Sequence, residues 1–244
     1  MSLRVLACLG LLVGCRDSID EMTEVYYRRP GARLVCAVSA DTRNSTMDSI
    51  TGGLDRARRD GTVLQLYAHE PGRTISRERV EAILAAAEQR GLATFTYREL
   101  AAGAPPRAGL ALSFDDDSID AWHALADVFD RHHARVTFFV SGYHRASDAQ
   151  RAKLHDLARR GHDIQAHSVD HPHVSYATTH GIDRYVSDQL LPNLAHLRAD
   201  GFDPTVFAYP YGERTAALDA ALLDHVTLLR TTAYAAKRGR DSCP

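Results

Sequence analysis

Cysteine, proline and tryptophan are scarce in this 244-residue sequence, which contains 4 Cys, 9 Pro and 1 Trp. The cysteines lack any Cys-x-x-Cys spacing, which argues against a zinc site built from cysteine pairs. Positive charge is not in excess, because 29 Lys and Arg face 31 Asp and Glu, and we therefore expect no nucleic-acid partner. Apolar runs are shorter than the ~18 to 20 residues that span a bilayer. What is present is 45% hydrophobic and 25% charged residues, the composition of a folded globular protein.

The beginning of the chain has the pattern of an export signal. Arg4 supplies a positive charge, and the uncharged stretch 5–14 that follows is too short to span a bilayer. Its end, Leu12-Val13-Gly14-Cys15, resembles the bacterial lipobox, in which cleavage leaves a diacylated cysteine as the new N-terminus. The alternative is a buried first strand of a cytosolic protein, because short apolar runs are ambiguous.

From this pattern we predict a signal peptide over residues 1–14, a lipid on Cys15 and a charged, solvated tether over 15–32. The protein would then be exported to the bacterial cell envelope and held at the membrane through the lipid anchor. Cys36 and Cys243 would be the cysteines left over, and they could pair if the compartment is oxidising.

Short apolar runs of β type alternate with longer stretches of helical periodicity along the rest of the chain. This alternation is typical of parallel β/α units, and about seven or eight of them favour a closed or nearly closed barrel. We therefore predict an α/β fold in a single domain over residues 33–244. The predicted strands are 34–38, 62–67, 93–97, 109–114, 135–140, 163–166, 205–209 and 226–229. The predicted helices are 45–59, 76–90, 118–133, 149–160, 215–224 and 182–199, the last kinked or restarted by Pro192.

Polar residues follow four of the predicted strands at the point where each strand ends. The four segments are Asp115-Asp116-Asp117, His167-Ser168-Val169-Asp170-His171, Pro210-Tyr211-Gly212 and His69-Glu70. In a β/α barrel the loops after the strands converge on one mouth, which is where the chemistry takes place. The sequence therefore predicts a functional site at this end of the barrel.

Two histidines four residues apart and a carboxylate form the ligand set of a catalytic divalent metal that keeps a position open for water. His167, His171 and one of Asp115 and Asp116 would supply this set. The other aspartate could then take a proton from that water. The alternative is a solvated acidic loop with unrelated histidines, since the chain contains 13 His.

Taken together, these segments resemble the NodB-homology polysaccharide deacetylases, carbohydrate esterase family 4. The segments that carry the resemblance are Ser113-Phe114-Asp115-Asp116, Val136-Thr137-Phe138-Phe139-Val140, Gly161-His162-Asp163-Ile164, His167-Ser168-x-x-His171 and Tyr209-Pro210-Tyr211-Gly212. They cover residues 109–230. The resemblance implies a distorted (β/α) barrel of about seven parallel strands and metal-dependent hydrolysis of N- or O-linked acetyl groups on glycans.

By the same resemblance, Asp116, His167 and His171 would bind Zn²⁺ or a related ion, and Asp115 would be the catalytic base. The Pro210-Tyr211 segment would contact the substrate, with the main-chain N–H of Tyr211 helping to hold the oxyanion. The substrate would be an acetylated glycan of the envelope or the extracellular space.

The sequence departs from the family pattern at two positions near these motifs. The family often has an arginine, oriented on the catalytic aspartate, where this chain has Ala208. This puts the tuning of Asp115 in doubt. Asp117 stands where many members have glycine, which adds a negative charge beside the site.

A third departure concerns the order of the motifs. The family's last motif, Leu-x-His on a late strand, supplies the general acid, but no predicted strand after Gly212 carries it. Residues 33–100 resemble the family's C-terminal part and 109–234 its N-terminal part, which suggests a circular permutation, because a barrel is cyclic. His69 would then be the general acid, the alternative being that it caps the loop before Pro71. Asp41 either faces the same mouth or caps a turn.

Two other functions remain open at this point. One is a non-catalytic sugar-binding lipoprotein with a degraded deacetylase site, which Ala208 favours. The other is a metal-dependent amidase acting on a non-sugar amide, because loops that set the specificity are not decoded by sequence alone. The sequence leaves the glycan, the metal in the cell and the oligomeric state undetermined.

Overall fold

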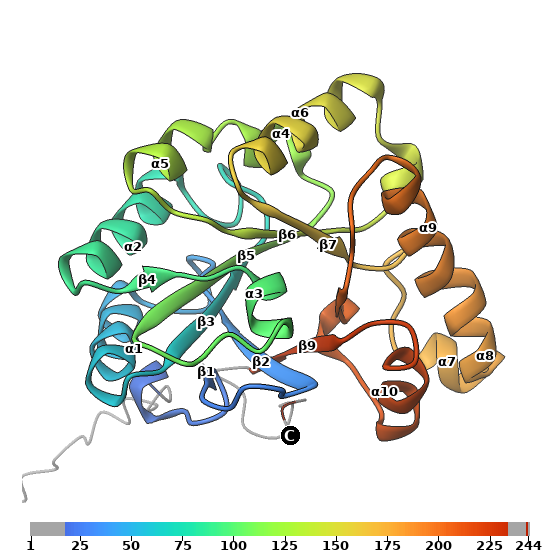
Figure 1. The fold of residues 1–244 in the computed structure, drawn as a ribbon, viewed down its shortest axis with the longest axis horizontal. Coiled ribbons are helices and arrows are strands. Elements are labelled where there is room, and N and C mark those ends of the chain that lie inside the picture. The colour runs from blue at the N-terminus through green and yellow to red at the C-terminus, as the bar shows by residue number, and fades with distance from the viewer. Residues whose placement is uncertain (1–17, 234–242, 244) are drawn as a thin grey trace, which may run out of the picture.

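The computed structural model describes residues 18–233 and residue 243, which form one closed barrel surrounded by helices (Figure 1). Seven parallel strands follow one another around the barrel in the order β3-β2-β9-β8-β7-β6-β5, and the pairing of β5 with β3 closes it. The predicted distorted (β/α) barrel is confirmed. Its strands are β2 (Leu34–Ser39), β3 (Val63–Ala68), β5 (Gly109–Asp116), β6 (Thr137–Val140), β7 (Asp163–Ala166), β8 (Val206–Ala208) and β9 (Leu228–Ala233).

The distortion lies where two short extra strands pair with the barrel. β1 (Tyr26–Tyr27) runs antiparallel to the beginning of β3, whereas β2 pairs with the end of β3. β4 (Ala93–Thr94) pairs with the beginning of β5, whereas β6 pairs with its end. The barrel is therefore splayed where its strands begin and fully paired around the mouth where they end.

Helices surround the barrel, and one of them, α3 (Tyr97–Ala101), packs against its inward-facing residues. The α-helices are α1 (Met47–Asp60), α2 (Arg77–Gln89), α3 (Tyr97–Ala101), α4 (Ile119–His123), α5 (Ala126–Arg131), α6 (Asp148–Arg159), α7 (Ser175–His180), α8 (Ile182–Tyr185), α9 (Leu191–Ala199) and α10 (Ala216–Leu222). Single turns of 3₁₀ helix occur at Ile19–Glu21, Tyr143–Arg145 and Pro210–Gly212, and a π-helical turn at Val186–Leu190 joins α8 to α9. None of the described helices is long and apolar enough to cross a membrane.

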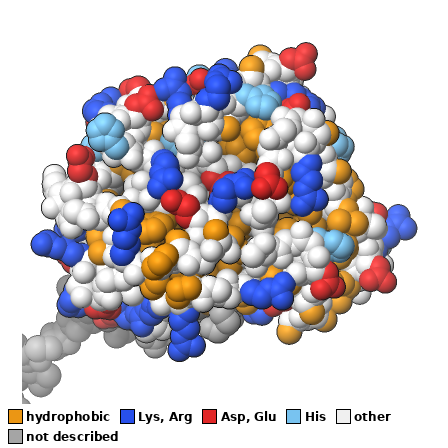
Figure 2. All heavy atoms as spheres, viewed as in Figure 1, with side chains coloured by type: hydrophobic (Ala, Val, Ile, Leu, Met, Phe, Trp, Pro, Cys, Tyr) orange, Lys and Arg blue, Asp and Glu red, His pale blue; other side chains and the backbone are white. Residues whose placement is uncertain are grey.

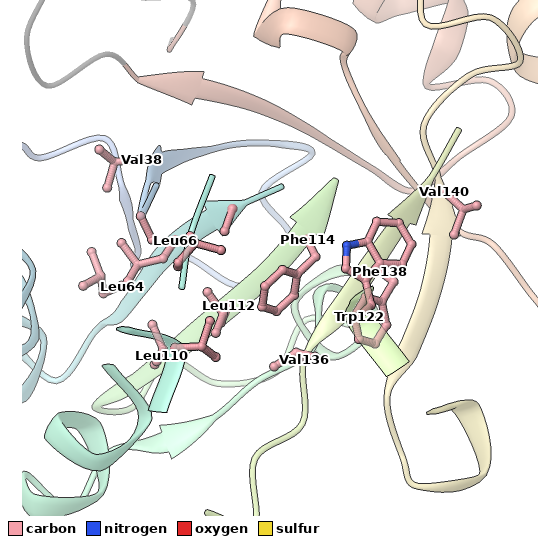
Figure 3. Close-up of a cluster of buried hydrophobic side chains, with 14 of the residues drawn as sticks. Val38, Leu64, Leu66, Leu110, Leu112, Phe114, Trp122, Val136, Phe138 and Val140 are labelled. Atoms are coloured by element: carbon pink, nitrogen blue, oxygen red, sulfur yellow. The ribbon is translucent and has the colours of Figure 1, made fainter. Parts of the chain in front are cut away.

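Alternation along each strand divides the core into two layers. Outward-facing residues such as Leu64, Leu66 and Phe114 belong to the main apolar cluster, which Figure 3 shows together with the buried Trp122. Inward-facing residues form a smaller apolar cluster around Phe139 and Val206. The inner positions nearer the mouth are polar and buried. They include Gln65, Ser113, Asp115, His167, Arg230 and Thr232.

Two sequence-based expectations about strands and helices are corrected by the structure. Residues 93–97 form only the two-residue strand β4 before α3 begins, because Thr96 caps that helix with a capping box. The predicted helix 118–133 is divided into α4 and α5. The expected restart at Pro192 is confirmed, because the α-helix α9 begins at Leu191, after the π-helical turn, with Pro192 in its first turn.

The predicted tether over 15–32 is wrong for its described part. Ile19, Val25 and Tyr26 are buried, and the hydroxyl of Tyr26 donates to the carbonyls of Ile19 and Gly53. The free energy gained by burying these apolar side chains against α1 exceeds what the neighbouring charged residues gain from a fully solvated segment. The expected signal peptide and Cys15 lie outside the described residues.

Cys36 in β2 and Cys243 form a disulfide, with their Cα atoms 5.7 Å apart. The predicted pairing is therefore confirmed. On the face drawn in Figure 2, Lys and Arg side chains are interspersed with Asp and Glu, in keeping with a net charge of −2.

Candidate metal centre and catalytic site

Three predicted ligands converge at the mouth of the barrel. Asp116 is the last residue of β5, and His167 and His171 lie in the loop after β7. Nε2 of His171 is 3.2 Å from Nε2 of His167 and 3.2 Å from Oδ1 of Asp116. Nε2 of His167 is 3.5 Å from the same Oδ1. The three atoms thus form a nearly equilateral triangle.

The backbone turns sharply at this cluster. Asp116, Ser168 and His171 have φ values of 87°, 69° and 56°, which are rare for residues other than glycine. Conformations of this kind cost about 1 to 3 kcal/mol each and occur at functional sites, where the surrounding structure imposes them. One such restraint is local, because the hydroxyl of Ser168 accepts a hydrogen bond from the N–H of His171 at 3.0 Å.

The ring of His167 is oriented by a hydrogen bond on the side away from the other two ligands. It is 2% exposed, and its Nδ1 is 2.8 Å from the carbonyl oxygen of Ala208 in β8. Since a carbonyl only accepts, Nδ1 carries the proton, which leaves the lone pair of Nε2 directed at the triangle. This backing is typical of histidines that bind metals.

Burial and charge keep these groups in their metal-binding forms. Burial, assisted by the neighbouring His167, lowers the pKa of His171 to about 4. Burial would raise the pKa of Asp116, but the proximity of His167 and the positive charge of the nearby His69 outweigh it and lower the pKa. At neutral pH the site therefore presents a neutral imidazole and a carboxylate, and no proton needs to leave either before a cation binds.

The dimensions of the triangle fit a zinc ion. Ligand atoms about 2.1 Å from a tetrahedral Zn²⁺ lie about 3.4 Å from one another, close to the separations at this site. Oδ1 of Asp116 is buried and makes no hydrogen bond, as an atom reserved for a metal would be. Among the described residues, no other group of three such side chains could hold an ion.

Asp115 is paired with a buried arginine. Nη2 of Arg230 lies 2.5 Å from each carboxylate oxygen of Asp115, and Arg230 is 0% exposed. Its guanidinium also lies over the rings of Tyr67 and Phe139, at 5.2 and 4.9 Å from their centroids. Burial would lower the pKa of Arg230, but the charge of Asp115 more than offsets it, so the pKa of the guanidinium is raised.

His69 and Asp41 form a second pair at the mouth. Nδ1 of His69 is 2.5 Å from Oδ2 of Asp41, whose Oδ1 accepts from the hydroxyl of Thr74 at 2.9 Å. Burial alone would lower the pKa of His69, but the hydrogen bond to Asp41 and the charges of Asp115 and Asp116 raise it to about 9. The Asp41 carboxylate therefore faces the mouth, and the residue that caps the following helix α1 is Thr46, whose side chain accepts from the N–H of Ser49.

Strand register brings His69 close to Asp115. Ala68 of β3 pairs with Phe114 of β5, so the residues that follow them lie at the same level of the mouth. The indole N–H of Trp122 donates to the carbonyl of His69 at 3.0 Å. Trp122 is fully buried, as expected of a packing residue.

Tyr211 lies on the loop after β8, beside the three candidate metal ligands. It is 44% exposed and has a φ of 57°. Its ring stacks on His173, with centroids 3.7 Å apart and planes at 4°, and lies at an angle to His171 with centroids 4.6 Å apart. Glu213 anchors this arrangement, since its carboxylate contacts Nδ1 of His173 at 3.2 Å and accepts from the N–H of Val174. The adjoining Pro210 is buried.

Comparison with known proteins gives the family. The family model described as polysaccharide deacetylase matches residues 102–226, about half of the chain. The chain belongs to the polysaccharide deacetylase family. Asp115, Asp116, His167 and His171 all fall inside the matched region, whereas His69 and Asp41 precede it and Arg230 follows it.

Individual proteins resemble this chain in sequence or in fold. A protein of Arthroderma benhamiae named as a probable peptidoglycan-N-acetylglucosamine deacetylase is 30% identical over 105 residues, which are 42% of this chain and 23% of that protein. The chain thus spans about a quarter of the length of that curated relative. Among solved structures, IcaB from Ammonifex degensii superposes with a TM-score of 0.61 at 22% identity, covering 71% of this chain and 86% of IcaB. The deacetylase PplD of Streptococcus pyogenes gives 0.52 at 18% identity, with 71% and 92% covered.

Arg230 is the residue of this deacetylase-family site that sequence reasoning missed. It lies opposite Ala208 in the pairing of β9 with β8, so the two side chains are on the same face of the barrel. The guanidinium expected at Ala208 is therefore supplied from the neighbouring strand. A signal was present, since a single arginine lies in the otherwise uncharged run of β9, but the predicted strand ended one residue before it.

Proposed function

We propose that this protein is a zinc-dependent hydrolase that removes N- or O-linked acetyl groups from an acetylated glycan of the cell envelope or extracellular space. The observation that carries the proposal is the juxtaposition of three side-chain groups at one mouth. These are the metal triangle, formed by Asp116, His167 and His171, the Asp115–Arg230 pair and the His69–Asp41 pair. They correspond to a Lewis-acid site, a base and an acid.

The ligands of the ion would be Asp116, His167 and His171. Zinc bound there would polarise the acetyl carbonyl and lower the pKa of a bound water. Asp115 would accept the proton of that water. Arg230 holds both carboxylate oxygens of Asp115 and so fixes its position beside Asp116.

His69 would deliver a proton to the leaving nitrogen or oxygen. Its raised pKa keeps the imidazolium populated at neutral pH, and Asp41 holds Nδ1, leaving Nε2 as the donor. The main-chain N–H of Tyr211 would stabilise the oxyanion. The Tyr211–His173 stack would form a wall of the mouth against which a sugar ring packs.

Acetate release from a panel of acetylated glycans tests this function. The panel contains an N-acetylated chitooligosaccharide, an O-acetylated xylooligosaccharide and a small aryl acetamide as the non-sugar control. We expect chelator-sensitive release from at least one glycan and little from the acetamide. Release only from the acetamide would favour the amidase alternative, and binding without release would favour a sugar-binding protein.

We also propose that the protein is exported and lipid-anchored through Cys15. The Cys36–Cys243 disulfide supports export, because disulfides persist in oxidising compartments.

We further propose that the chain is a circular permutation of the family's usual order. The family match begins at residue 102, and residues 33–100 contribute His69 and Asp41 from outside it.

A further inference from the structure

The loop 167–171, here called the metal loop, carries two of the three candidate ligands and is held by hydrogen bonds from the helical stretch 186–199. Two buried amide side chains, Gln189 and Asn193, are 3% and 1% exposed. Gln189 lies in the π-helical turn that joins α8 to α9, Asn193 lies in the first turns of α9, and both bond to the backbone of the metal loop. Neither was singled out by sequence.

Asn193 joins the metal loop to the neighbouring strand. Its Oδ1 accepts from the N–H of His167 at 3.1 Å, and its Nδ2 donates to the carbonyl of Val140 at 3.2 Å. Val140 ends β6 and is paired with the end of β7. The amide therefore fixes the point at which the chain leaves the sheet and enters the metal loop.

Gln189 holds the middle of the metal loop. Its Oε1 accepts from the N–H of Asp170 at 2.9 Å, and its Nε2 donates to a carboxylate oxygen of Asp170 at 3.1 Å. The carbonyl of Gln189 accepts from the N–H of Val169 at 3.2 Å. Three bonds from one residue thus restrain the stretch between His167 and His171.

The π-helical turn at Val186–Leu190 precedes Pro192, which has no N–H with which to continue an α-helical ladder. Such turns are rare and occur often at functional sites. Here the turn contains Gln189, and Asn193 follows four residues later, so the two amides project from neighbouring turns of one helical face.

We propose that Gln189 and Asn193 are positioning residues that hold the metal loop in its ligand-bearing conformation before any metal binds. Ser168 and His171 have positive φ values, and a loop free to relax would leave that conformation. The hydrogen bonds of the two side-chain amides oppose this relaxation of the loop, and they do so without occupying the metal site. The inference rests on the metal site of the proposed function and adds residues that set its affinity.

Zinc affinity in matched variants tests the proposal. Asn193→Leu and Gln189→Met remove the hydrogen bonds of the side-chain amides and keep a side chain of similar volume. Gln165→Met is the control. Gln165 is also a fully buried amide, on β7, but it bonds to Thr205, Val206 and Asp163, away from the metal loop. Affinity is measured by competition with a chromophoric chelator, and the melting temperature of the metal-free protein is recorded alongside.

Loss of a hydrogen-bonding partner behind metal ligands typically costs 10- to 100-fold in affinity. We expect a loss of this size in Asn193→Leu and Gln189→Met, and little change in Gln165→Met even if all three melt earlier. Equal affinity in all variants, or an equal loss in all three, would overturn the proposal. A wild type that binds no zinc would instead refute the metal site itself.

Hydrogen exchange in the wild type gives a second test that needs no variant to fold. In the metal-free protein the N–H groups of His167, Val169 and Asp170 should exchange as slowly as those of the barrel strands. Fast exchange that slows only when zinc is added would mean that the metal orders the loop, and would contradict the proposal.

Discussion

Arg230 of β9 pairs with Ala208 of β8 and places its guanidinium 2.5 Å from both oxygens of Asp115. The contact joins opposite parts of the barrel interior, in a place where neither charge reaches solvent. A lone carboxylate would be costly there, since removing one partner of a buried ion pair typically costs 3 to 5 kcal/mol.

Replacing Arg230 with Met should therefore lower the free energy of unfolding by about 3 to 5 kcal/mol and abolish most turnover. Chemical denaturation and acetate release measure the two effects. The double variant Ala208→Arg with Arg230→Ala should recover part of both, because paired positions on adjacent parallel strands share one face. Arg230→Met with wild-type stability and turnover would show that the pair is dispensable.

Replacing His69 with Ala should reduce turnover by roughly 10² to 10⁴-fold and leave zinc bound, because His69 is not one of the proposed ligands. Zinc stoichiometry and steady-state kinetics check the two parts separately. Turnover close to that of the wild type would rule out His69 as the general acid, and loss of zinc would assign it a ligand role instead.

Replacing Asp41 with Asn should move the pKa of His69 down from about 9 toward the ordinary 6.5, since the carboxylate stabilises the imidazolium. The folded-state pKa lies above the unfolded one, so this pair stabilises the wild type fully below about pH 6.5. The stabilisation is lost as the pH rises through about 9.

Melting temperatures at pH 6 and pH 9.5, recorded without zinc, measure this contribution. The wild type should lose more stability over that interval than Asp41→Asn, and NMR titration of the His69 ring should give the two pKa values. Parallel stability curves for the two proteins would contradict the prediction.

Replacing Cys15 with Ser should release the protein from the membrane fraction or block its processing, because the lipid would have no thiol to join. Fractionation of expressing cells, with a Cys8→Ser variant as the matched control, measures this. Unchanged membrane association of Cys15→Ser would refute the anchor.

The parts of the site with a local sequence signal could be predicted. Asp115, Asp116, His167 and His171 follow apolar strand patterns directly, and in a parallel barrel the ends of strands meet at one mouth. The spacing of His69 after β3 gave its position in the same way. In each case the backbone pattern alone determined where the side chain would lie.

The supporting residues had no such signal. The contact of Arg230 with Asp115 depends on the register between β8 and β9, and the roles of Gln189 and Asn193 depend on how a distant helix packs on the loop after β7. The packing of Ile19 against α1 was hidden by the adjacent charges, which indicated solvent exposure. Tertiary contacts decided each of these positions.

Acetate release during a zinc titration of the metal-stripped protein tests the central claim most directly. Release should rise with bound zinc and level off at one ion per chain. Asp115→Asn should bind the same single ion and release acetate roughly 10² to 10⁴-fold more slowly, because it lacks the base. Full activity in the stripped protein, or equal zinc binding by a His171→Ala variant, would contradict a catalytic metal held by Asp116, His167 and His171.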